Sequence, residues 1–89
     1  MILTPQKTFP EWVRNLRKEM NVREDHSSII KTGISLATLK HWENTETLPN
    51  IKTILKMTAK LSERSGESPQ DILDTIMESI PEWRRINGK

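Results

Sequence analysis

Hydrophobic residues recur every three or four positions along most of the chain, which is the spacing of an amphipathic α-helix. Short polar stretches that contain Gly, Pro, Asn or Ser separate these segments, and no segment alternates hydrophobic and polar residues as a half-buried strand does. The pattern predicts helices over about residues 10–20, 25–32, 36–44 and 51–63, and a fifth from 69 to about 80. Helices joined by short links indicate a compact all-α, five-helix fold.

The predicted helix ends carry residues that suit capping. Thr8, Ser35, Asn50 and Ser68 each precede a helix, where a side-chain oxygen can accept a free backbone N–H of the first turn. Asn21 follows the first helix and tolerates the left-handed conformation common at that position. We therefore expect defined helix starts with tight links between them.

The inward faces follow from the same spacing. In the second helix, we expect Ile29 and Ile30 to face the core. We expect the fourth helix to bury Ile51, Ile54, Leu55, Thr58, Ala59 and Leu61, and the fifth to line the core with Ile72, Leu73, Ile76, Met77 and Ile80. An apolar stripe near the end of the chain has two interpretations, closure of the core or the seam of a homodimer. Its members are Ile76, Met77, Ile80 and Trp83.

Composition limits the classes of function. The chain has 89 residues, enough for one small domain, and no cysteine, so neither a disulfide nor a thiolate metal site is expected. Two histidines without cysteine make a metal site or cofactor unexpected. Asp25, His26 and Ser27 are neighbours in sequence and so do not face one another as a catalytic triad does, and we expect no enzyme. With no signal-like start and no long apolar run, a cytoplasmic location is expected.

Charge is unevenly distributed along the chain. The formal net charge is only +2, yet residues 1–60 carry ten Lys and Arg against six Asp and Glu, and residues 61–89 carry four against six. A basic region of this kind suits a polyanionic partner, although solvated surface alone would also account for it.

Three segments then carry a family resemblance. They are EWVRNLRKEM (residues 11–20), GISLATLKHWEN (33–44) and PNIKTILKMTAKL (49–61). In this order and spacing the chain resembles the Cro/phage-repressor type of helix-turn-helix protein, also called XRE-like or lambda-repressor-like, over about residues 9–76. The expected division is an N-terminal arm at 1–8, a helix-turn-helix DNA-binding domain at 9–80 and a C-terminal tail at 81–89, for which a dimer contact is one of the two interpretations given above.

The resemblance also implies roles for single residues. Arg17 and Glu43 match an ion pair that ties the first helix to the end of the third. The positions that match base-contacting residues are Leu36, Ala37, Thr38, Lys40 and His41. Those assigned to phosphate contacts are Ser35, Asn44, Asn50, Lys52 and Lys31. If the apolar stripe at the end of the chain is a dimer seam and does not close the core, its contacts are Met77, Ile80 and Trp83. Solvated surface is the plain alternative for His41, and core packing is expected for Trp42.

The implied function is a repressor-like transcriptional regulator that binds double-stranded DNA as a homodimer, in the cytoplasm at the nucleoid. The alternative is a protein-interaction module of the same fold, such as an antitoxin or an adaptor that binds no DNA. Glu24 and Asp25 favour this alternative, because two acids near the start of the second helix would repel DNA unless they are turned aside or engaged in capping.

Overall fold

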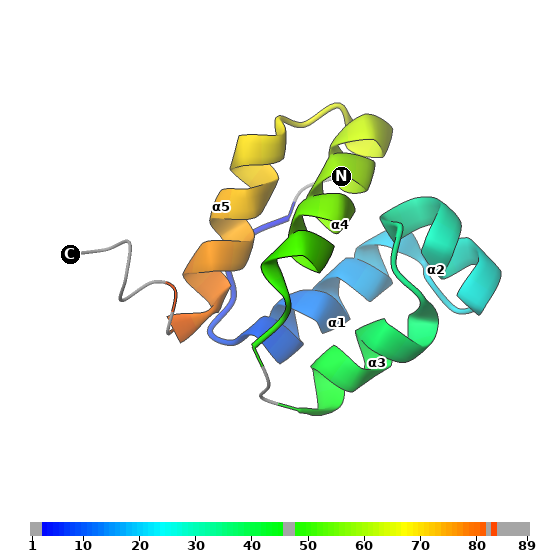
Figure 1. The fold of residues 1–89 in the computed structure, drawn as a ribbon, viewed down its shortest axis with the longest axis horizontal. Helices are drawn as coiled ribbons and strands as arrows, with labels where there is room; N and C mark the ends of the chain where they lie inside the picture. Colours follow the sequence, from blue (N-terminus) through cyan, green and yellow to red (C-terminus); the bar gives the residue numbers. More distant parts are fainter. Residues whose placement is uncertain (1–2, 46–47, 82, 84–89) are drawn as a thin grey trace.

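Five α-helices form the regular structure of this computed structural model, which describes residues 3–45, 48–81 and 83. They are α1 (Phe9–Met20), α2 (Asp25–Thr32), α3 (Leu36–Asn44), α4 (Ile51–Ser65) and α5 (Pro69–Ser79). No strand occurs in this part of the chain. The predicted all-α, five-helix fold is confirmed, with α1 and α4 slightly longer than expected. In Figure 1, α4 and α5 lie side by side. Helix α1 packs against α5 and α3, and α2 packs against α4 and α3.

The predicted caps form at the helix ends. The Thr8 hydroxyl accepts the Glu11 N–H at 3.3 Å, the Asn50 carbonyl oxygen accepts the Lys52 N–H at 2.8 Å, and Ser68 accepts the N–H of the residue two positions later at 3.1 Å. Asn21 takes the left-handed conformation, with φ 54°. The capping bonds start α1, α4 and α5 where the sequence indicates, and Asn21 ends α1 there as well.

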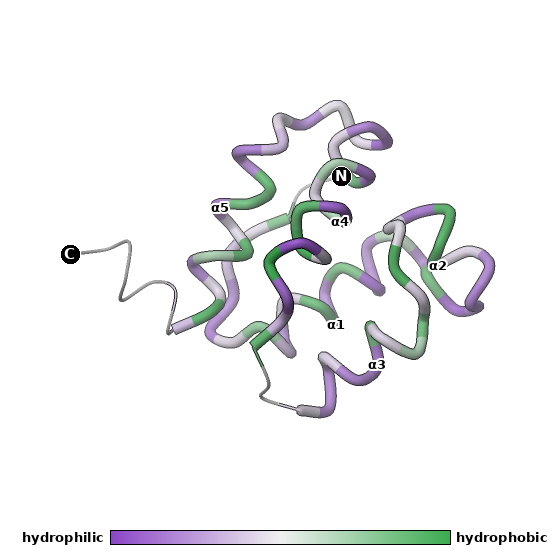
Figure 2. Tube along the Cα trace, in the orientation of Figure 1, coloured by the Kyte–Doolittle hydropathy of each residue, from purple (hydrophilic) through white to green (hydrophobic). Residues whose placement is uncertain are grey.

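The core is centred on α1. Trp12 is fully buried, and its indole N–H donates to the Thr75 hydroxyl on α5 at 3.1 Å. The ring of Phe9 stacks on Trp12 and lies 5.2 Å, between centroids, from Trp42 on α3, which is buried as expected. In Figure 2, hydrophobic and hydrophilic residues alternate along each helix at helical spacing. The aromatic cluster therefore holds α3 and α5 on opposite sides of α1.

The N-terminal segment belongs to this core. Leu3 is buried, and the backbone N–H of Gln6 donates to the Ser79 hydroxyl at 2.8 Å. The expected arm at 1–8 therefore packs on the domain from Leu3 onward, and residues 1–2 lie outside the described part.

The end of α5 also contributes to the core. Ile80 is 1% exposed, so of the two interpretations of its stripe, core closure is correct for Ile80 and the dimer contact assigned to it is wrong. Met77 is partly buried, and Trp83 packs against the core. Residue 82 and residues 84–89 of the expected tail lie outside the described residues.

Two predicted inward faces need correction. In α4, Ile51 and Leu55 are each 49% exposed and Ala59 is exposed as well. The buried stripe instead runs through Ile54, Met57, Thr58 and Leu61. These positions follow the i, i+3, i+4, i+7 spacing of one helix face, whereas Ile51 and Leu55 lie on its flank.

In α2, Ile29 and Ile30 are exposed, and Ser28 and Thr32 take the buried face instead. Both hydroxyl groups are satisfied by hydrogen bonds. Ser28 donates to the Ile34 carbonyl at 2.6 Å, and Thr32 donates to the Ser28 carbonyl at 2.8 Å and accepts the Ile34 N–H at 3.1 Å. A buried polar pair is tolerated because both hydroxyl groups find hydrogen-bond partners in the turn.

Candidate nucleic-acid interface

The exposed face of α3 is a continuous stripe of small and polar side chains. Leu39 and Trp42 are buried and fix the back of the helix. The exposed residues opposite them are Ala37, Lys40, His41 and Asn44. Their i, i+3, i+4, i+7 spacing places them on one face, which we call the α3 stripe. The helix is therefore packed on one side and open to a partner on the other.

The first turn of α3 is occupied by its own capping interactions. The Ser35 hydroxyl accepts the Thr38 N–H at 3.3 Å and lies 2.9 Å from the Thr38 hydroxyl. Leu36 is partly buried and packs against the core. Of the residues predicted to contact bases, Ala37, Lys40 and His41 therefore lie on the stripe, and Leu36 and Thr38 lie on its flanks.

Asp25 is the second cap of α3. Its carboxylate, on the first residue of α2, accepts the Leu36 N–H at 3.0 Å. Asp25 is thus engaged in capping. We expected the acids near the start of α2 to repel DNA unless they were turned aside or engaged in capping, and Asp25 meets the second condition. Glu24 precedes α2 and makes no side-chain capping bond there. No local motif indicates the Asp25 contact, because its two ends are separated by a whole helix and a turn.

The other end of α3 is tied to α1 by charge. Glu43 is 9% exposed in its side chain and accepts a hydrogen bond from Arg17 Nη1, so the predicted ion pair is confirmed. Arg14 Nε lies 3.8 Å from the second carboxylate oxygen, but its side chain is 64% exposed. Arg14 was not predicted to take part. The sequence signal for it is its position three residues before Arg17, on the same face of α1.

The residues predicted to contact phosphate are in different situations. Lys52 is exposed at the start of α4, two residues after Asn50, whose side chain accepts the Lys52 backbone N–H. Asn44 is exposed, and its amide donates to the Lys40 carbonyl at 2.8 Å. Lys31 donates to the Met20 carbonyl at 2.8 Å. The prediction for Lys31 is corrected, since its ammonium group caps the C-terminal end of α1 and is not directed away from the protein.

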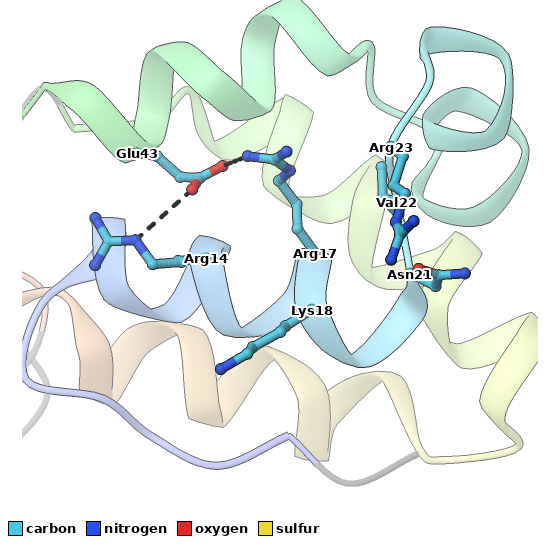
Figure 3. A pocket seen from close by; sticks show the side chains of 7 residues that line it. All are labelled: Arg14, Arg17, Lys18, Asn21, Val22, Arg23 and Glu43. Atoms are coloured by element: carbon cyan, nitrogen blue, oxygen red, sulfur yellow. Dashed lines mark hydrogen bonds and ion pairs between the residues drawn. The ribbon is translucent and has the colours of Figure 1, made fainter.

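A basic pocket that the sequence did not reveal lies beside the Glu43 end of α3. Its volume is about 390 Å³. In Figure 3, Arg14 and Arg17 extend from α1 toward Glu43, and Arg23 extends from the link before α2. The lining residues are Arg14, Arg17, Lys18, Asn21, Val22, Arg23 and Glu43. Basic side chains separated in sequence meet here only because α1, its following link and α3 pack together.

Comparison of the chain with protein-family models, curated proteins and solved structures found no match to any of them. The resemblance to Cro-type repressors therefore stays a prediction. Among the described residues, no helix is long and apolar enough to cross a bilayer, and no group of three or more His, Asp or Glu side chains is placed to hold a metal ion.

Proposed function

We propose that this protein binds double-stranded DNA by inserting the α3 stripe into the major groove, as a repressor-like transcriptional regulator. The observation that carries the proposal is an exposed polar stripe on a helix fixed at both ends, by Asp25 at its start and by Arg17 at its end. The major groove, about 12 Å wide, admits one α-helix. A helix held rigidly at the surface can enter it without a further ordering cost.

The stripe has modest capacity to distinguish bases. Ala37 can make apolar contact with a thymine methyl group, and His41 can donate or accept a hydrogen bond at a base edge. Lys40 can reach guanine or a phosphate. A good bidentate contact discriminates by about 1–3 kcal/mol, and these residues do not form the Arg–guanine or Gln–adenine pairs that supply it. Specificity of one subunit is therefore limited.

Affinity in this proposal comes mainly from phosphate contacts and from pairing of two subunits. The cations assigned to these contacts are Lys52, which is exposed at the start of α4, and Arg14 and Arg23, which line the pocket at Glu43. A homodimer would place its two α3 helices in successive major grooves, about 34–36 Å apart. Regulation of transcription in the cytoplasm, at the nucleoid, follows as part of the same proposal.

Selection of bound duplexes from a random pool, followed by fluorescence anisotropy at several salt concentrations, tests the proposal. The combined variant Lys40→Glu, His41→Ala should lose binding while its thermal unfolding is unchanged. Arg64→Glu is the control, because it reverses one charge outside the α3 stripe, in the last turn of α4. A salt-independent response, or none with any duplex, would reject the proposal.

A second candidate is a protein-interaction module, such as an antitoxin that binds a toxin. It is favoured by the exposed apolar side chains at the start of α4, namely Leu48, Ile51 and Leu55. Exposed apolar patches often mark protein contacts. Unchanged biological activity of the Lys40→Glu, His41→Ala variant, together with loss of activity in Leu55→Glu, would favour this candidate over DNA binding.

A further inference from the structure

We propose that the basic pocket between α1 and α3 binds a phosphate group. Four of its lining residues are cationic, and they are Arg14, Arg17, Lys18 and Arg23. Glu43 is the one carboxylate among the residues that line it. The pocket therefore carries a positive excess and is suited to an anionic ligand.

The positive charge is not neutralised by neighbouring acids. Glu43 is shared by Arg17 and Arg14, so a single carboxylate faces two guanidinium groups. In the described part of the chain, no carboxylate lies within ion-pair distance of Lys18 or Arg23. Both side chains are exposed at the rim and can approach a ligand with little rearrangement.

Size and chemistry select the type of anion. A volume of about 390 Å³ is near the lower end for a small-molecule site, which spans roughly 300–1,000 Å³. Val22 is the one apolar residue among those that line the pocket, and the positive charge of the pocket comes from the arginine and lysine side chains around it. Guanidinium groups present planar, paired N–H donors that match two oxygens of one phosphate, whereas a halide is a single spherical ion without paired acceptor atoms. A phosphate group fits these conditions.

The pocket lies next to the α3 stripe. Lys40 belongs to the stripe and Glu43 to the pocket wall. They are three residues apart on α3, so the two features lie within about one helical turn of each other. A phosphate in the pocket would draw Arg14 away from Glu43, because their atoms are 3.8 Å apart and the Arg14 side chain is largely exposed, and would leave the Arg17 bond in place. Occupancy is thereby linked to the end of α3.

Two sources can supply a phosphate group to this pocket, and both would be bound by the same cationic side chains. A free phosphate-bearing small molecule could occupy the pocket without DNA. The backbone of a duplex held by the α3 stripe could place a phosphate there, and only this source rests on the proposed function.

Titration of the isotope-labelled full chain with inorganic phosphate, at constant ionic strength against chloride, tests the proposal by NMR. Saturable shifts are expected in the backbone amides of Arg14, Lys18 and Arg23 and in the arginine side-chain N–H signals. The exposed-site variants Arg14→Gln and Arg23→Gln should each weaken phosphate binding about tenfold, since each removes a charge-assisted contact. Lys52→Gln and Arg64→Gln are controls outside the pocket and should bind phosphate as the unchanged chain does.

A second titration with a short duplex distinguishes the sources. Shifts at the pocket with both ligands, or with the duplex alone, support the proposal and identify the backbone as a source. Saturation by phosphate with no response to any duplex supports the pocket and rejects DNA binding. Linear, non-saturating shifts with phosphate and an unperturbed pocket in the presence of duplex would overturn the proposal, as would equal weakening in the control variants.

Discussion

The Asp25 carboxylate accepts a hydrogen bond from the backbone N–H of Leu36 at 3.0 Å, so the first residue of α2 caps the first turn of α3. Ser35 satisfies a second N–H of the same turn, that of Thr38. The first turn of a helix presents unpaired N–H groups and a partial positive charge, and a carboxylate stabilises both. The orientation of α3 relative to α2 thus depends on a side chain far from α3 in sequence.

Replacing Asp25 by Ala should lower the free energy of unfolding by about 1 kcal/mol, the usual cost of removing a capping side chain. Urea denaturation measures this directly. Glu24→Ala is the control, because Glu24 precedes α2 without a side-chain capping bond and its loss should change the midpoint little. Equal destabilisation by both substitutions would contradict a capping role for Asp25.

The Arg17–Glu43 pair should matter more than the Arg14–Glu43 pair. Removing one partner of a well-buried pair costs about 3–5 kcal/mol, but the Arg17 side chain is 26% exposed, so we expect a cost of about 2 kcal/mol for Arg17→Gln, which leaves the Arg14–Glu43 pair in place. Arg14→Gln should cost less than about 1 kcal/mol, because Arg14 is largely exposed. Thermal and chemical unfolding of the two variants would show the difference. Similar losses in both would mean that solvent screens the Arg17 bond as well.

Much of the fold could be predicted because its determinants are local. The caps at Thr8, Asn50 and Ser68 and the left-handed Asn21 depend on neighbours within a few residues, and all four form as predicted. Periodicity also gave the bounds of α2 and α3 correctly.

The incorrect predictions have a common physical origin. Ile29 and Ile30 are more hydrophobic than Ser28 and Thr32, so a ranking by hydrophobicity places the wrong face inward. The buried hydroxyl groups are stabilised by bonds to the Ile34 backbone across the turn, which composition cannot reveal. Likewise, the contacts of Asp25 and Lys31 and the basic pocket depend on how separate helices meet, so helical spacing could not indicate them.

Two glycines offer a matched test of the turn between α2 and α3. Gly33 and Gly66 both end helices with positive φ, 77° and 80°. A Cβ at Gly33 would lie 3.4 Å from Lys60 Cβ, whereas one at Gly66 would meet nothing within 4 Å. Both Ala substitutions incur the left-handed strain of about 1–2 kcal/mol. Gly33→Ala should cost at least as much as Gly66→Ala, with any excess due to the packing of α4 against the turn, and calorimetry of both variants measures it. A larger loss at Gly66 would contradict this.

If α3 enters the major groove, substitutions of Lys52 and His41 should change different properties of DNA binding. Lys52 is assigned to a phosphate, so Lys52→Gln should weaken binding to all duplexes alike and reduce the slope of log affinity against log salt by about one. His41 is assigned to a base edge, so His41→Ala should leave the slope unchanged and relax preference at one position of the selected site, by about 1 kcal/mol. Anisotropy titrations over a salt series, with the selected duplex and single-base variants of it, measure both quantities. The assignments are wrong if His41→Ala changes the slope as Lys52→Gln does, or if Lys52→Gln alters base preference.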